Sequence, residues 1–372
     1  MQRPILFFLL MLSSSLIAQT YHTHAYGRKI VFPDVPDYQT LTCDFHMHTV
    51  FSDGMVWPSI RVDEALRDSL DVIATTEHLE YQPKSADIPH PDRNRAFEIA
   101  TRSARAYDLL VVNGSEITRS LPPGHVNAIF VEDANELLIE DSLEVFREAN
   151  RQGAFTFWNH PNWLGQRDDA IAELTDFHKL LIDEELLHGI EVVNDRTYSD
   201  EALQIALDND LTIIGTSDIH GLVDWQYNVP QGGHRPITLV FATEKTPEAI
   251  KEALFARRTV AYFNNLLIGR EEHLKPLIEA CLTAETQGYE GVRSVINVDI
   301  KNTSDTPFIL ANNSDFTFHA NSDVIILEPH ATTTLQVKTR KQLDAFELPF
   351  TVLNGISAPN EHPEITFSVR TR

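Results

Sequence analysis

Closely spaced histidines and carboxylates, suited to metal binding, occur twice in the chain. His46 and His48 end an apolar segment that also contains Asp44. Because side chains two residues apart in a strand point the same way, we expect all three to face one side. Two converging imidazoles make half of a transition-metal site. Asp218 and His220 repeat this spacing after a later apolar run, so the two pairs together predict a metal centre at strand ends.

Further residues of ligand type lie between these pairs, each close to an apolar run. The full candidate set is His46, His48, Asp53, His78, Glu116, His125, His160, Asp218 and His220. Zinc usually takes four ligands, so this set exceeds the need of a single ion. It suffices for two or three ions if a carboxylate bridges them. A mixed histidine and carboxylate set favours zinc, manganese or iron over calcium or magnesium, so we expect two to three divalent transition metals as cofactors.

The elements that must position these residues alternate between strand-like and helix-like patterns. Apolar strand-like runs cover residues 41–45, 71–75, 109–112, 126–131, 154–158, 190–193, 211–215 and 237–242. Helical spacing fills the gaps; Ser199 can cap one helix, and Thr246 followed by Pro247 is a typical start of another. This alternation predicts an α/β fold with a parallel, buried sheet. Because the candidates follow the ends of several strands, a closed barrel with those ends at one mouth fits better than an open sheet.

The sequence changes character near residue 275. Short alternating β runs separated by turn residues replace the helical spacing. We therefore predict a barrel domain over residues 41–275 and a small β-sandwich-like domain over residues 276–372. No set of residues suited to catalysis is recognisable in the second domain.

The N-terminus has the pattern of an export signal. A positive start, a short apolar core and a small residue at Ala18 predict a signal peptide over residues 1–18, followed by a lead-in segment over residues 19–40. The apolar run is short for a transmembrane helix. We therefore expect an exported protein, periplasmic or extracellular, without a stable membrane anchor.

The charge of the chain limits its partners. A formal net charge of -24 argues against sequence-independent binding to long nucleic acids, which depends on lysine and arginine. It does not exclude a small phosphate ester, because bound cations can reverse the local field. We expect such an ester as substrate; the sequence does not predict the oligomeric state.

The order and spacing of the nine candidates resemble the polymerase and histidinol phosphatase (PHP) family. The first motif of that family is His-x-His followed by Ser-Asp or similar, and its last is Asp-x-His; the resemblance covers residues 40–270. It implies a distorted (β/α)7 TIM-like barrel with a metal cluster at the C-terminal mouth of the strands. It also implies that His46, His48, Glu116 and Asp218 hold one metal, that Glu116 bridges to a second metal completed by His125 and His160, and that Asp53, His78 and His220 hold a third.

The resemblance also implies an activity. A metal pair of this kind would hydrolyse phosphate esters with a metal-bridging hydroxide, without a side-chain nucleophile. The signal peptide and the β-rich tail look like an exported phosphodiesterase subgroup of the family, so we favour phosphodiesters over monoesters. Candidates to orient ligands or substrate are Asp44, Glu77, Asn159 and Asn194.

Two other functions remain as alternatives. One is a non-catalytic interaction module with a PHP-type barrel, against which the complete ligand set argues. The other is an amidohydrolase-like metal hydrolase acting on a non-phosphate substrate. Enzymes of that kind usually carry a carboxylated lysine bridge, and here Glu116 fills that role.

Overall fold

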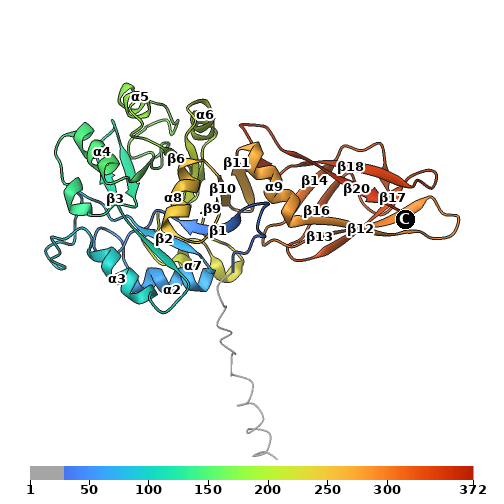
Figure 1. Ribbon diagram of the computed structural model, residues 1–372, viewed down its shortest axis with the longest axis horizontal. Coiled ribbons are helices and arrows are strands. Elements are labelled where there is room, and N and C mark those ends of the chain that lie inside the picture. The colour runs from blue at the N-terminus through green and yellow to red at the C-terminus, as the bar shows by residue number, and fades with distance from the viewer. Residues whose placement is uncertain (1–28, 372) are drawn as a thin grey trace, which may run out of the picture.

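The computed structural model describes residues 29–371, which form an α/β part followed by a β domain (Figure 1). The strands of the α/β part are β1 (Gln39–Asp44), β2 (Val72–Thr75), β3 (Leu110–Thr118), β4 (His125–Ile129), β5 (Phe155–Trp158), β6 (Gly189–Asn194), β7 (Thr197–Tyr198), β8 (Thr212–Thr216), β9 (Ile237–Ala242), β10 (Thr259–Phe263) and β11 (Leu266–Gly269). Its helices are α2 (Pro58–Asp68), α3 (Arg95–Ala104), α4 (Ser142–Arg151), α5 (Asp176–Asp183), α6 (Asp200–Asp208), α7 (Val223–Gln226), α8 (Pro247–Phe255) and α9 (Glu271–Cys281), with short 3₁₀ helices at Ala134–Leu137 and Val229–Gln231.

The sheet of the α/β part is mixed, so the prediction of a parallel sheet was right only in part. Pairs β1–β2, β2–β3, β5–β6 and β6–β8 are parallel as expected. Pairs β3–β4, β4–β5, β1–β9 and β9–β10 are antiparallel. For β3 and β4 the reason is the length of the connection, because residues 119–124 are too few for the crossover that parallel strands require.

The sheet curves into a barrel-like arrangement. Its order is β19-β11-β10-β9-β1-β2-β3-β4-β5-β6-β7, with β8 on the other edge of β6. Strand β8 is joined to β9 by the Thr238 hydroxyl, which accepts from the Gly215 amide at 3.0 Å and donates to the Gly215 carbonyl at 2.8 Å. The Thr259 hydroxyl donates to the Ile213 carbonyl at 2.7 Å and joins β8 to β10. The fold is therefore an α/β barrel-like fold, and the count of seven βα units stays a prediction.

The helices begin where their capping residues predict. Helix α6 is capped by the Ser199 hydroxyl, which accepts from the Ala202 amide at 3.1 Å. Helix α8 is capped by Thr246, and Pro247 occupies its first turn. The first turns of these helices thus have side-chain acceptors for amides that lack a partner within the helix. No helix among the described residues is long and apolar enough to cross a membrane.

The C-terminal domain consists of two four-stranded sheets, as the alternating pattern predicted. One sheet has the order β12-β13-β17-β15 and the other β16-β14-β18-β20. These eight strands are β12 (Leu282–Tyr289), β13 (Val295–Asn302), β14 (Phe308–Asn312), β15 (Thr317–Phe318), β16 (Val324–Leu327), β17 (Thr332–Lys338), β18 (Ala345–Val352) and β20 (Glu364–Arg370), and the short β19 (Gly355–Ile356) lies outside both sheets. Buried and exposed side chains alternate along β13 and β18, and the buried ones share one apolar core, as in a β-sandwich.

The two parts are joined through α9 and β19. Helix α9 runs directly into β12, so the predicted boundary after residue 275 falls inside this helix. Strand β19 comes from the C-terminal region but pairs in parallel with β11 of the barrel-like sheet. Of the predicted lead-in, Ile30 and Phe32 are buried in the core. The predicted signal peptide at 1–18 lies outside the described residues.

Candidate metal centre

The segments after β1 and β8 lie side by side and present the two predicted pairs. The His48 amide donates to the Ile219 carbonyl at 3.0 Å, and the Asp218 amide donates to the His46 carbonyl at 2.9 Å. Met47 and Ile219 form an isolated parallel bridge between these segments. The His-x-His and Asp-x-His motifs are therefore brought together by backbone hydrogen bonds, although about 170 residues separate them in the chain.

Glu116 and His125 reach the same mouth from neighbouring antiparallel strands. Glu116 lies within β3, which extends beyond the strand predicted at 109–112. Thr118 near the end of β3 pairs with His125 at the start of β4. Because β4 runs opposite to β3, its first residue lies at the edge where β3 ends. His125, at the start of β4, therefore lies beside metal-ligand candidates that follow the ends of other strands.

Four predicted ligands form a compact group around one point. The Nε2 atoms of His46 and His48 lie 3.1 Å apart, and Asp218 Oδ1 lies 3.2 and 3.1 Å from them. The Glu116 oxygens lie 3.7 Å from His46 Nε2 and 3.6 Å from His48 Nε2. Donor atoms about 2.1 Å from a tetrahedral ion are about 3.4 Å apart. The spacing of this group fits a single transition-metal ion.

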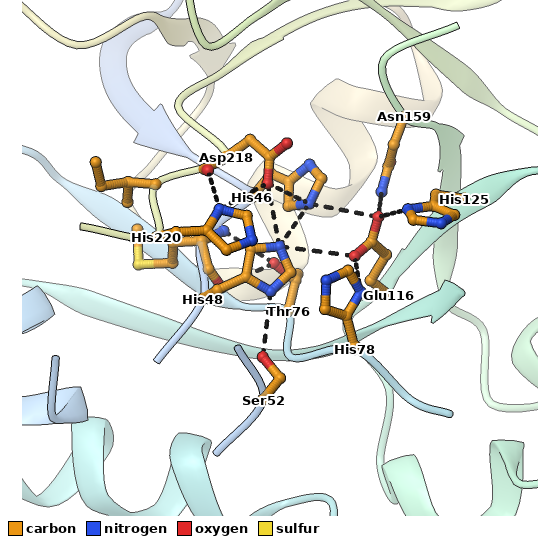
Figure 2. Close-up of polar contacts among 12 residues, drawn as sticks. His46, His48, Ser52, Thr76, His78, Glu116, His125, Asn159, Asp218 and His220 are labelled. Carbon is orange, nitrogen blue, oxygen red and sulfur yellow. Dashed lines mark hydrogen bonds and ion pairs between the residues drawn. The ribbon is translucent and has the colours of Figure 1, made fainter. Parts of the chain in front are cut away.

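The Glu116 carboxylate lies at the centre of the cluster (Figure 2). Its Oε1 atom lies 2.9 Å from His125 Nδ1 and 3.5 Å from His160 Nε2. Its Oε2 atom faces His48 and lies 2.5 Å from His78 Nδ1. The carboxylate therefore presents one oxygen to His125 and His160 and the other to His48 and His78, as a bridging ligand would.

Asp53, His78 and His220 form a further group beside His48. Asp53 Oδ1 lies 3.1 Å from His220 Nε2, and Asp53 Oδ2 lies 3.4 Å from His78 Nε2. The ring of His48 stacks on both rings of this group, 4.4 Å from the His78 ring and 4.2 Å from the His220 ring. All nine predicted ligands are thus gathered into one continuous cluster.

The carboxylates Glu116 and Asp218 are held in the ionised form, which is the form that binds metal. Burial opposes ionisation of Glu116, but the surrounding imidazoles, led by His78, hold the pKa of its carboxyl well below the usual range. Burial likewise opposes ionisation of Asp218, yet His46 and His48 lower the pKa of this carboxyl. Burial, with His78 and His220 close by, lowers the pKa of His48 to about 3, which leaves its ring neutral. Burial opposes protonation of His46, His78, His160 and His220, but the neighbouring carboxylates raise the pKa of these rings above the usual value, so a metal ion that binds them would displace their protons.

Several buried atoms of the cluster form no hydrogen bond within the described part of the chain. They are Asp53 Oδ1, Glu116 Oε2, His125 Nδ1 and His160 Nδ1. Asp53 Oδ1, Glu116 Oε2 and His125 Nδ1 nevertheless lie within 3.1 Å of an atom of another ligand residue, so buried donor atoms crowd together without hydrogen-bond geometry. The donor set and this crowding of its atoms therefore fit divalent metal ions.

Comparison with known proteins identifies the family. A two-domain protein from Bacteroides vulgatus that contains a predicted PHP-like metal-dependent phosphoesterase is 42% identical, covering 92% of this chain and 98% of that chain, with a TM-score of 0.86. The chain belongs to the PHP-like metal-dependent phosphoesterase family. A family model described as an Ig-like domain matches residues 282–368, which correspond to the C-terminal β domain.

Two further solved structures resemble the chain only weakly. PsfC from Pseudomonas syringae is 17% identical with a TM-score of 0.42, covering 65% of this chain and 96% of that chain. An amidohydrolase from Chromobacterium violaceum with bound sulfate and no metal is 15% identical with a TM-score of 0.35, covering 48% of this chain and 87% of that chain. Neither likeness is close enough to bear on the function. No curated protein matched the chain.

Glu191 orients two ligands of this PHP-like centre, and sequence analysis missed it. Its Oε1 atom lies 2.8 Å from His46 Nδ1, and its Oε2 atom accepts from the His160 amide at 2.7 Å. The side chain of Asn194, a predicted orienting residue, donates to Oε2 at 2.8 Å. The available signal was a lone carboxylate within the apolar strand β6, where a buried charge needs a polar partner.

Arg61 is the second residue that the sequence analysis missed. Its guanidinium, fully buried in α2, donates to the carbonyls of His48 at 3.0 Å, Gly221 at 2.7 Å, Ile219 at 3.1 Å and His220 at 3.0 Å. Its remaining donor contacts Glu64 Oε2 at 2.6 Å. All five donors of the side chain are used, and four of them bind the two ligand-bearing segments together.

The other predicted orienting residues, Asn159, Glu77 and Asp44, contact different parts of the site. Asn159 donates to Glu116 Oε1 at 2.9 Å. Glu77 accepts from the Thr49 amide at 3.1 Å and from the Ser52 hydroxyl, and so holds the loop after His48. Asp44 does not join the metal-ligand groups; its carboxylate instead accepts from the Ser217 hydroxyl at 2.6 Å and from Arg235 at 3.2 Å. It therefore supports the turn that precedes Asp218.

A cavity of about 590 Å³ opens above the cluster. Its walls include the ligands Asp53, His78, His125, His160, Asp218 and His220, together with Asn162, Trp163, Leu164, Ala170, Asn194, Asp195, Thr197 and Gln226. No lysine or arginine is among the described residues that line it. A bound anion would therefore be neutralised by metal ions and not by basic side chains.

Proposed function

We propose that the protein hydrolyses phosphate esters, preferentially phosphodiesters, with two or three divalent transition metals of the zinc, manganese or iron type. The central position of Glu116 carries this proposal, because its two oxygens face different groups of histidines. Ions bound there would supply Lewis acidity towards the phosphate and lower the pKa of a water that acts as the nucleophile. No side chain is needed as the nucleophile.

The residues of the chain have separate roles in this proposal. His46, His48, Glu116 and Asp218 hold the first ion, Glu116 with His125 and His160 the second, and Asp53, His78 and His220 the third. Glu191 and Asn159 orient His46 and Glu116. The 590 Å³ cavity provides the space in which the phosphate would lie beside these ligands.

The preference for diesters follows from charge. At neutral pH a phosphate monoester carries about 1.5 to 2 negative charges, because its second pKa is about 6. A diester carries one. The cavity presents the carboxylates Asp53, Asp195 and Asp218 but no basic side chain. Bound metal ions would neutralise the ligand carboxylates Asp53 and Asp218, which leaves Asp195 as the wall charge that favours the ester with less negative charge.

The experiment measures metal content and hydrolysis in one preparation. Purified protein is assayed for zinc, manganese and iron and for turnover of 4-nitrophenyl phosphate and bis(4-nitrophenyl) phosphate. We expect two to three ions per chain and a higher kcat/KM for the diester. Substitution Glu116→Gln should abolish turnover and lower the metal content, while Glu136→Gln, at an exposed position, should change neither.

Each other outcome contradicts a specific part of the proposal. Metal bound without turnover of either ester would favour an amidohydrolase-like reaction on a non-phosphate substrate or a non-catalytic module. A chain that binds no metal in stoichiometric amount would overturn the site. A higher kcat/KM for the monoester would reverse the substrate preference only.

We also propose that the protein is exported to the periplasm or the outside of the cell. The N-terminal sequence, with its positive start and apolar core, supports this, and an Ig-like domain is compatible with it. N-terminal sequencing of the protein from a periplasmic or culture fraction tests it. Cleavage near Ala18 is expected, and an uncleaved chain found only in the cytoplasm would contradict export.

A further inference from the structure

A second cavity of about 630 Å³ adjoins the metal centre. It shares His125 and Trp163 with the cavity above the cluster, so these two side chains stand between the two spaces. Its other walls include Tyr81, Arg119 and Gln166. A diester has two arms on one phosphorus, and one open cavity over the ions leaves the second arm without an assigned place.

Two exposed aromatic rings flank this second cavity next to metal-ligand histidines. Tyr81 is 52% exposed, and its ring lies edge-on to His78 with 5.7 Å between the centroids. Trp163 is 48% exposed and lies 5.5 Å from the His125 ring and 5.2 Å from the His160 ring. Large rings that line a cavity and are open to solvent are suited to stack on a ring of the ligand.

The charged residues of this cavity neutralise one another. Arg119 Nε lies 3.0 Å from Glu80 Oε1, and its Nη1 donates to the Glu140 carbonyl at 2.6 Å and the Ser142 hydroxyl at 3.0 Å. Its Nη2 donates to the Ile139 carbonyl. With every nitrogen of the guanidinium engaged, Arg119 is not available to bind a second anionic group. The cavity is therefore suited to an uncharged arm.

We propose that this second cavity binds one ester arm of the substrate, and that this arm is an uncharged, ring-bearing alcohol of the nucleoside class held between Tyr81 and Trp163. The inference rests on the proposed phosphodiesterase function and specifies its substrate class. Stacking of a base on an aromatic side chain is sequence-tolerant, so the identity of the base is secondary to its planarity.

Two diesters with the same leaving group test the proposal. Methyl 4-nitrophenyl phosphate and thymidine 5′-(4-nitrophenyl) phosphate both release 4-nitrophenolate when water adds to phosphorus, but only the second has a nucleoside arm. We expect kcat/KM to be at least about tenfold higher for the thymidine ester, in line with the stacking of one base. Tyr81→Ala and Trp163→Ala should each lower this ratio about tenfold.

Matched substitutions and a binding measurement complete the test. Tyr107→Ala and Trp225→Ala alter exposed rings of the same two types that line neither cavity, and the ratio should not change. Thymidine 5′-methylphosphonate, which carries one negative charge and lacks the leaving group, should quench the tryptophan fluorescence of the wild type and not that of Trp163→Ala. Melting curves show whether each variant is folded.

The outcomes separate the inference from the proposed function. Equal kcat/KM for both diesters in the wild type, or an unchanged ratio in folded Tyr81→Ala and Trp163→Ala, would overturn the nucleoside subsite and leave phosphodiester hydrolysis standing. No turnover of either diester by the metal-loaded wild type would overturn the proposed function and with it this inference.

Discussion

Glu191 lies 2.8 Å from Nδ1 of His46, on the nitrogen opposite to the one that faces Asp218 and His48. The carboxylate therefore holds the His46 ring with its Nε2 lone pair directed into the cluster. Carboxylates that bind the far nitrogen of a metal-ligating histidine set its tautomer and raise its basicity. The same side chain also accepts from the His160 amide, so it positions parts of two metal groups.

Substitution Glu191→Gln should weaken metal binding by roughly 10- to 100-fold, because the neutral amide makes His46 less basic. Competition with a chromophoric chelator measures the affinity. Glu173→Gln, in a side chain that is 81% exposed, is the matched control and should bind metal as the wild type does. Unchanged affinity in Glu191→Gln would show that Glu191 is structural only.

Substitution Arg61→Lys should destabilise the fold and reduce metal occupancy together. Lysine has three donors without the planar fork of arginine, so it cannot serve the carbonyls of His48, Ile219, His220 and Gly221 at once. We expect a loss of about 3 kcal/mol in the free energy of unfolding, as for a broken buried charge network.

Urea unfolding and metal analysis check the Arg61 prediction. Arg67→Lys, on the same helix but in a side chain that is 30% exposed, controls for the substitution itself. If Arg61→Lys kept both full metal content and wild-type stability, the guanidinium would not be what joins the two motifs.

Substitution Gly54→Ala should displace the loop that carries His48. A Cβ atom at Gly54 would lie 2.5 Å from the carbonyl carbon of His48 and 2.6 Å from the Thr49 amide nitrogen, which is far inside contact distance. We expect the protein to lose metal and about 1–3 kcal/mol of stability, as for other overpacked sites.

Gly221→Ala is the control for Gly54→Ala, because the nearest atom to its new Cβ would be 3.9 Å away. It lies at the same mouth, so it tests whether any added methyl group there disturbs the cluster. Metal content and melting temperature of the two variants should diverge. Equal effects would contradict the steric argument.

Because His178 is buried, the free energy of unfolding should fall in mild acid. Burial against the Trp158 ring, 4.0 Å away, lowers the pKa of His178 to about 4 although its Nε2 donates to the Pro123 carbonyl. In the unfolded chain the pKa of this histidine is about 6.5, so the unfolded state takes up the proton at a higher pH than the folded state does. The contribution of the neutral His178 ring to the free energy of unfolding is therefore complete above about pH 6.5 and is lost as the pH falls towards 4.

Urea unfolding at pH 7.5 and 5 measures this effect. The wild type should lose about 2 kcal/mol more between these pH values than His178→Gln, in which the position cannot titrate. The metal ligands are present in both proteins, so their own titration cancels in the difference. Equal losses in the two proteins would contradict the prediction.

Much of the α/β part follows from local patterns in the chain. Strands were expected where β1, β2, β5, β6, β8 and β9 occur, because apolar runs of this length need burial on both faces. Ser199 and Thr246 begin their helices because their hydroxyls supply acceptors for unpaired amides. The two-residue spacing of His46 and His48, and of Asp218 and His220, likewise has a local geometric cause.

Other features depend on contacts between distant segments. The antiparallel course of β4 lets His125 meet Glu116, and the pairing of β19 with β11 joins the two parts of the chain. No local pattern marks Arg61 as the donor to two ligand-bearing segments or Tyr81 and Trp163 as walls of one cavity.

The sequence by itself therefore determined which side chains could hold metal, since ligand chemistry and short spacing are properties of the residues. Only the tertiary structure decided that Glu116 stands at the centre, and that Glu191 and Arg61 hold the ligands in place. The physical reason is that hydrogen bonds and cavity walls act over a few ångströms in space. Those distances exist only after segments far apart in the chain have packed together.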